Sequence, residues 1–129
     1  MKALIAESDR ETVDNITVVF NLCLSDWKLV TTDSGKKCID MVKDNSLDMV
    51  ILGDLAEMSS SDVIDKIRSY SEVPIMVLSS INDEPVVVKA FDAGANGYMT
   101  KPLHRLELVA RIKTILRNKQ RNKPYKYSS

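Results

Sequence analysis

Five polar side chains stand where apolar runs of the sequence end. Glu7 and Asp9 follow the first such run, Asp54 follows another, Ser79 ends a third, and Lys101 follows the last. Carboxylates bind hard divalent cations through oxygen, a hydroxyl donates hydrogen bonds to an oxyanion, and a lysine supplies a compact positive charge. If the chain brings these residues together, they suit a phosphoryl group handled with Mg²⁺.

The apolar runs have the length and composition of strands. They cover residues 2–6, 28–32, 48–52, 73–80 and 96–100. Between and after them, apolar residues recur at three- and four-residue spacing, which predicts helices over residues 9–23, 34–45, 59–70, 84–93 and 103–119. Strands alternating with helices predict a doubly wound α/β domain with a five-stranded parallel sheet. Its site lies outside the carboxyl ends of the strands, where the five polar side chains would converge.

The composition is that of a globular protein. Of the 129 residues, 44% are hydrophobic and 28% are charged, which argues against a disordered or fibrous chain. No apolar run approaches the roughly 18 residues of a membrane span, and charge follows the N-terminus too early for a signal peptide. We therefore expect a cytoplasmic protein that does not associate with membranes.

The basic residues are concentrated at the C-terminal end. Residues 101–129 hold half of the 18 lysines and arginines, whereas Glu107 is their only acidic residue. Residues 120–129 are also polar and lack periodicity, so we predict a domain over residues 1–119 and a basic linker or tail over residues 120–129. A solvated linker explains this segment better than contact with nucleic acid.

From Lys2 to about Lys119 the sequence resembles the receiver domain of two-component response regulators. The resemblance is most specific in VPIMVLSS (73–80), GANGYMTKPL (94–103) and ELVARIKTILR (107–117). It implies a flavodoxin-like receiver fold that takes a phosphoryl group from a histidine kinase onto an aspartate at the end of the third strand. It also implies Mg²⁺ bound by acidic residues after the first strand.

Four residues match the functional positions of this family. By resemblance, Ser79 is the switch hydroxyl, Tyr98 is the switch aromatic residue and Lys101 contacts the phosphate. Pro102 is the proline that usually follows a cis peptide bond. The spacing from Ser79 to Lys101 follows the family pattern without a gap.

The other family positions are altered. Glu7 matches the first acidic residue, but Ser8 stands where a second carboxylate is expected, so Asp9 is the remaining candidate for a metal ligand. Gly53 falls on the phosphoacceptor position. Asp54 follows it, and because side chains of a strand alternate between faces, Asp54 should turn away from the direction of residue 53. A glycine also tolerates bulges that could redirect Asp54 into the crevice.

The last predicted helix resembles that of OmpR-like receivers, which carry a DNA-binding domain beyond a linker. The resemblance implies a homodimer through the segments 84–93, 96–100 and 103–119. Glu107, Arg111 and Lys113 are the candidates for ion pairs on this face, while the usual acidic partner is replaced at Asn96. No DNA-binding domain follows residue 119, which leaves two readings: part of a longer regulator, or a stand-alone receiver.

Three functions are compatible with these features. The leading hypothesis is an atypical receiver, not an enzyme, that dimerises or binds partners without phosphate and regulates transcription through a DNA-binding domain absent from this chain. The second is a phosphoaccepting receiver that uses Asp54 with Mg²⁺ bound by Glu7 and Asp9. The third is a small flavodoxin-like or nucleotide-binding enzyme, although no glycine-rich phosphate loop follows the first strand.

Overall fold

The computed structural model describes residues 1–120 of the chain. The predicted tail over residues 120–129 therefore lies outside the described residues except for Gln120, which ends the last helix. Among the described helices, none is both long enough and apolar enough to cross a membrane. The predicted domain over residues 1–119 is described throughout.

Over residues 1–120, five strands and five helices alternate, as the sequence predicts. The strands are β1 (Lys2–Ala6), β2 (Lys28–Thr32), β3 (Met49–Leu52), β4 (Ile75–Ser79) and β5 (Gly97–Thr100). The helices are α1 (Arg10–Cys23), α2 (Gly35–Asp44), α3 (Ser60–Arg68), α4 (Glu84–Ala93) and α5 (Arg105–Gln120). All pairings are parallel in the order β2-β1-β3-β4-β5, which confirms the doubly wound fold.

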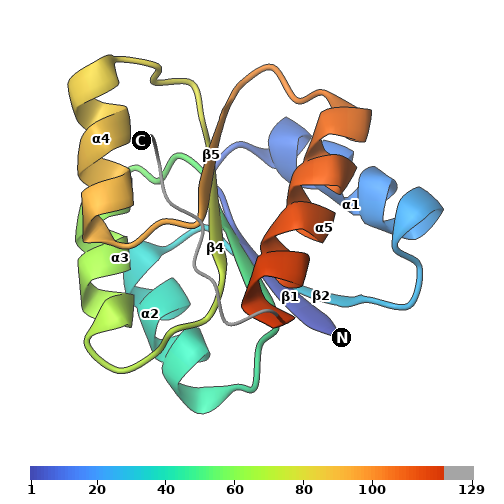
Figure 1. Cartoon of the computed structure of the whole chain (residues 1–129), viewed down its shortest axis with the longest axis horizontal. Coiled ribbons are helices and arrows are strands. Elements are labelled where there is room, and N and C mark those ends of the chain that lie inside the picture. The colour runs from blue at the N-terminus through green and yellow to red at the C-terminus, as the bar shows by residue number, and fades with distance from the viewer. Residues whose placement is uncertain (121–129) are drawn as a thin grey trace.

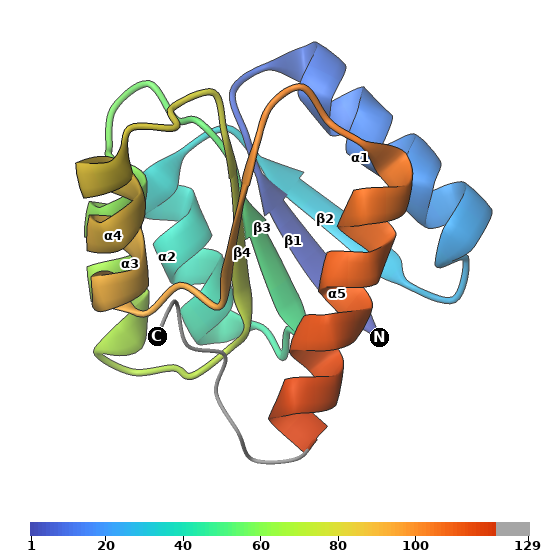
Figure 2. The ribbon, with the colours of Figure 1, turned by 45° about the horizontal axis from the view of Figure 1, so that its top comes forward.

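Helices cover both faces of the sheet. In Figures 1 and 2, α1 and α5 lie on one face, and α2, α3 and α4 lie on the other. Consecutive side chains of β3 point to opposite faces of the sheet. Ile51 packs in the core under α1 and α5, while Val50 and Leu52 pack in the core under the other three helices. This alternation determines where the residues after β3 point.

Local signals in the sequence explain most element boundaries. Ser34 and Ser59 cap α2 and α3 by accepting hydrogen bonds from backbone N–H groups. Gly94 ends α4 with a φ of 121°, a conformation that favours glycine. β4 begins at Ile75 rather than at residue 73, because Pro74 has no N–H to donate to a neighbouring strand.

Candidate functional site

The carboxyl ends of β1, β3 and β5 meet at Lys101. Its Nζ lies 3.0 Å from Glu7 Oε1 and 3.0 Å from Asp54 Oδ2. The Glu7 side chain is 1% exposed and that of Lys101 is 18% exposed. One partly buried ammonium group therefore bridges two carboxylates from different strands.

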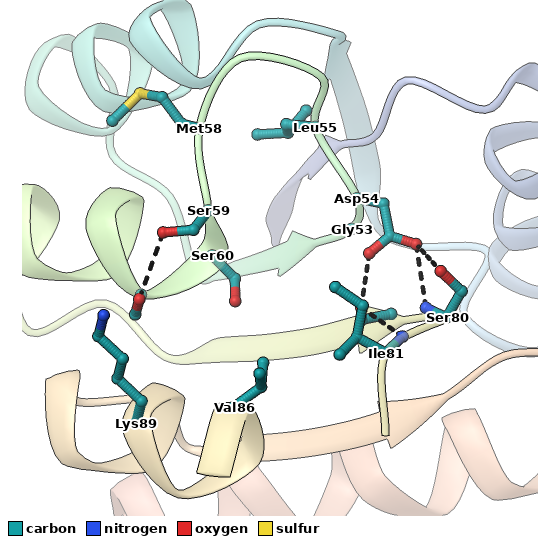
Figure 3. A pocket seen from close by; sticks show the side chains of 12 residues that line it. Gly53, Asp54, Leu55, Met58, Ser59, Ser60, Ser80, Ile81, Val86 and Lys89 are labelled. Atoms are coloured by element: carbon teal, nitrogen blue, oxygen red, sulfur yellow. Dashed lines mark hydrogen bonds between the residues drawn. The ribbon is translucent and has the colours of Figure 1, made fainter. Parts of the chain in front are cut away.

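Asp54 also contacts the end of β4. Its Oδ1 accepts a hydrogen bond of 2.5 Å from Ser79 Oγ, and its Oδ2 accepts bonds of 3.0 Å from Ser80 N and from Ser80 Oγ. The bonds to Ser80 are drawn in Figure 3. With Lys101, four donors thus surround this single carboxylate.

Gly53 leaves space that the Glu7 carboxylate fills. A Cβ at residue 53 would lie 2.0 Å from Glu7 Oε1 and 2.7 Å from Glu7 Cδ. Its backbone needs no special conformation, since of the four glycines only Gly94 has a positive φ. Gly53 therefore permits the close approach of the Glu7 carboxylate, and it does not act as a bulge that redirects the chain.

The strand alternation explains both positions. A Cβ on residue 53 would point to the Glu7 carboxylate, on the face where Ile51 packs under α1 and α5. Asp54 points to the other face, where it borders the cavity next to α4. Asp54 does turn away from the direction of residue 53, as the sequence predicts, yet it still reaches the crevice. It does so because Ser79 ends β4 on that same face, at the neighbouring strand.

Opposing influences act on the pKa values of the bridged groups. Burial is the largest influence on Asp54 and raises its pKa, but hydrogen bonds from Ser79, Ser80 and Lys101 together lower it below its usual value of 3.8. Burial lowers the pKa of Lys101, but hydrogen bonds and charge from Glu7 and Asp54 raise it above 10.5. The carboxylate of Asp54 and the ammonium group of Lys101 are both charged at neutral pH.

The residues expected to bind Mg²⁺ are engaged in other contacts. Glu7 Oε2 accepts from Asp9 N at 2.9 Å, while Asp9 Oδ2 accepts from Thr12 Oγ1 at 2.6 Å. Ser8 Oγ donates to the Asp54 carbonyl at 2.7 Å. Within residues 1–120, no group of three or more acidic, histidine or cysteine side chains is placed to hold a metal ion. Arranged in this way, with Lys101 beside Glu7, the residues do not fit Mg²⁺.

A chain of hydrogen bonds leads from Asp54 to Tyr98. Ser79 Oγ donates to Asp54 and accepts from Ile81 N at 3.0 Å. The Ile81 carbonyl in turn accepts from Tyr98 Oη at 2.6 Å, and Tyr98 is buried beneath this segment. The Lys101–Pro102 peptide bond is cis, as the resemblance implies.

A cavity of about 340 Å³ opens between the loop after β3 and the start of α4 (Figure 3). Asp54 and Ser80 stand at one end of it and Lys89 at the other. Both apolar side chains and hydroxyls line the cavity: Leu55, Met58, Ile81 and Val86, together with Ser59, Ser60 and Ser61. Asp54 is therefore accessible to a small molecule from the side of α3 and α4.

The candidate dimer residues are not gathered in one cluster. Arg111 Nη2 lies 3.5 Å from Glu107 Oε2 within α5, and both are exposed enough to meet a partner. Lys113 follows Arg111 by two residues and so points about 200° away around the helix. Asn96 Oδ1 accepts hydrogen bonds from Arg68 Nη2 and Ile75 N, each within 2.9 Å. This side chain therefore makes contacts within the fold that stabilise the start of β4.

The sequence places the Ser80 hydroxyl beside Ser79 at the end of the fourth strand, but the family resemblance gives Ser80 no role. In the structure both its amide and its hydroxyl donate to Asp54. The roles of Ser79, Tyr98 and Lys101 stay predictions, and the structure shows these three residues to be linked to Asp54.

Comparison with known proteins identifies the family. Residues 3–113 match the response regulator receiver domain family. The chain therefore belongs to that family. This receiver domain is 35% identical over 119 residues to the cell cycle transcriptional regulator CtrA of Caulobacter vibrioides, covering 91% of this chain and 51% of CtrA. It is 34% identical to the cell cycle response regulator CtrA of Brucella ovis, again over 119 residues, covering 91% of this chain and 50% of the relative.

The receiver domain thus spans about half the length of the curated relatives it matches. Solved receivers share its fold. A two-component response regulator from Clostridium difficile superposes with a TM-score of 0.85 at 23% identity, covering 92% of this chain and 98% of that one. The receiver domain of a sensor histidine kinase from Pseudomonas aeruginosa has a TM-score of 0.79 at 18% identity over 89% of this chain and 96% of that one, with a magnesium ion coordinated in its active-site cleft.

Proposed function

We propose that this receiver domain transmits its signal without forming an aspartyl phosphate, as an interaction module of a cytoplasmic two-component transcription regulator. The observation that carries the proposal is the relation between Gly53 and Glu7. The position where the family resemblance expects the phosphoacceptor has no side chain, and the Glu7 carboxylate fills the space that such a side chain would occupy.

Asp54 is a poor substitute for the absent acceptor. A carboxylate nucleophile needs an oxygen lone pair aligned with the phosphorus atom of the donor, and hydrogen bonds to that oxygen weaken its attack. Both oxygens of Asp54 accept hydrogen bonds, Oδ1 from Ser79 and Oδ2 from Ser80 and Lys101. These bonds withdraw electron density from the carboxylate and fix its orientation.

One observation favours the competing function, in which Asp54 accepts a phosphoryl group. Asp54 stands beside the family's hydroxyl and lysine positions and borders an open cavity. Intact mass after incubation with a small-molecule phosphodonor and MgCl₂ separates the two functions. We expect an unchanged mass, with a receiver that keeps an aspartate at this position as the positive control. One added phosphoryl group that is absent from Asp54→Ala would overturn our proposal.

We also propose that the output passes through the face formed by α4, β5 and α5. Exposed apolar residues lie on two of these elements, Val88 on α4 and Leu106 on α5, and an apolar patch must supply most of the affinity of such a surface. The partners are a second copy of the chain and an upstream histidine kinase, and DNA would be reached through a domain outside this chain.

Light scattering tests the self-association. We expect Arg111→Glu to shift the chain towards monomer, because it places two like charges on one turn of α5. Arg10→Glu is the matched control, since Arg10 pairs with Asp14 at the same i,i+4 spacing on α1, a helix that is not part of the proposed face. An equal effect of both variants, or a wild type that is monomeric at all concentrations, would contradict the proposal.

A further inference from the structure

The donors around Asp54 form a set that would suit any oxyanion. Ser79 Oγ, Ser80 N, Ser80 Oγ and Lys101 Nζ all lie within 3.0 Å of its two oxygens. Two hydroxyls, one amide and one ammonium group also form the kind of site that binds a phosphate or sulfate ion. In this chain a side chain of the protein already satisfies all of them.

We propose that the Asp54 carboxylate is a built-in anion that occupies an oxyanion site and holds residues 79–81, and through them Tyr98, in one arrangement. This inference deepens the proposed function and rests on it in one respect, namely that no phosphoryl group joins Asp54. Asp54 is a positioning residue in this account, because it acts on Tyr98 through other groups.

The first step from Asp54 runs through Ser79. Ser79 is 3% exposed, and its hydroxyl donates its proton to Asp54 while accepting from Ile81 N. A hydroxyl that donates to a carboxylate becomes a better acceptor, so the two bonds strengthen each other. Without the carboxylate, the Ser79 hydroxyl is free to rotate and its bond to Ile81 N loses this support.

The second step runs from Ile81 to β5. The Ile81 carbonyl accepts from Tyr98 Oη, and Tyr98 is 8% exposed. A buried phenol hydroxyl without a hydrogen-bond partner destabilises the folded state, so the Tyr98 side chain should follow the Ile81 carbonyl when residue 81 moves. The arrangement of Tyr98 on β5 is thereby coupled to an anion at the end of β3.

Removal of the Asp54 carboxylate should uncover an anion site. In Asp54→Ala the hydroxyls of Ser79 and Ser80 and the Ser80 amide lose their acceptor, and Lys101 keeps only Glu7. A tetrahedral oxyanion can then occupy the vacated space and restore the contacts. Inorganic phosphate is the probe, because it offers several acceptor oxygens and needs no enzyme.

Amide and aromatic NMR signals of the intact chain test the proposal. We expect Asp54→Ala to shift the amide signals of Ser80 and Ile81 and the ring signals of Tyr98, and we expect phosphate to return them towards their wild-type positions. Phosphate should bind the variant about tenfold or more tightly than it binds wild type, the factor expected from one or two charge-assisted hydrogen bonds. Asp65→Ala, on the exposed side of α3, is the control and should leave these signals in place.

A second variant covers the case in which Asp54→Ala does not fold. Asp54→Asn keeps the shape and one acceptor oxygen but removes the charge, so it should still move the Ser80 and Ile81 signals. Unchanged Ile81 and Tyr98 signals in a folded variant would overturn the proposal, and so would phosphate that binds wild type and variant equally. A phosphorylated Asp54 in the mass experiment would defeat the proposed function, whereas these NMR measurements, made without a phosphodonor, test separately whether the unmodified carboxylate holds residues 79–81 and Tyr98 in place.

Discussion

The Glu7 carboxylate lies where the side chain of residue 53 would begin, with Oε1 only 2.0 Å from the position of a Cβ on Gly53. Glu7 is nearly fully buried, so its carboxylate has little space into which it can withdraw. The same oxygen contacts Lys101. The identity of residue 53 and the integrity of the ion pair are therefore coupled.

Gly53→Ala tests this coupling. The added methyl group should displace Glu7 from Lys101 and lower the free energy of unfolding by about 1–3 kcal/mol. Urea denaturation followed by the fluorescence of Trp27 measures it, because Trp27 packs edge-on against Phe20 in the core under α1. In a Glu7→Ala background the same substitution should cost much less, and equal costs in both backgrounds would disprove the coupling.

Lys101→Met tests the bridge itself. It leaves the buried Glu7 carboxylate without its cation and Asp54 without one of its donors. Breaking a buried ion pair from one side costs about 3–5 kcal/mol, and we expect the lower end because Lys101 is partly exposed. Lys89→Met, at the exposed end of the cavity, should change stability by about 0.5 kcal/mol or less. A Lys101 variant as stable as the Lys89 variant would refute a structural role for the bridge.

The bridge also predicts a pH dependence. The pKa of Asp54 is lower in the folded state than its ordinary value of 3.8, so its contribution to stability is present above that pH and is lost as pH falls through the folded pKa. The pKa of Lys101 is raised above 10.5, so its contribution is complete below that pH and is lost as pH rises through the folded pKa.

We therefore expect the stability difference between wild type and Asp54→Asn to be constant around neutral pH and to shrink below pH 3.8. Urea titrations at several pH values measure this difference. A difference that grows on acidification would show that the carboxylate gains nothing from its partners in the folded state.

Arg68 should be a determinant of stability away from the site. Its guanidinium donates to the Gly94, Ser71 and Val73 carbonyls and to Asn96 Oδ1. Arg68→Lys cannot reproduce this forked geometry and should lower the free energy of unfolding by about 2–4 kcal/mol. Arg117→Lys on the exposed side of α5 should be close to neutral, and calorimetry of both variants distinguishes them. Equal melting temperatures would contradict the prediction.

The local sequence determined the elements of this fold. Short apolar runs identify each strand, and apolar residues at three- and four-residue spacing identify each helix. Ser34, Ser59 and Gly94 mark helix ends because capping depends on neighbouring backbone groups. Parallel strands carry their carboxyl ends to one edge, so the convergence of Glu7, Asp54 and Lys101 also followed from the pattern.

The tertiary structure decided how those residues meet. Strand alternation alone predicts that residues 53 and 54 point to opposite faces of the sheet. Only the neighbouring strands show that Glu7 occupies the space next to Gly53 and that Ser79 lies next to Asp54. From the sequence, Asn96 is interpreted as the replacement of an acidic residue on the dimer face. The structure shows instead that it accepts a hydrogen bond from Arg68, 28 residues away. Such partners are distant in sequence, and their contacts depend on strand order and register, which periodicity does not encode.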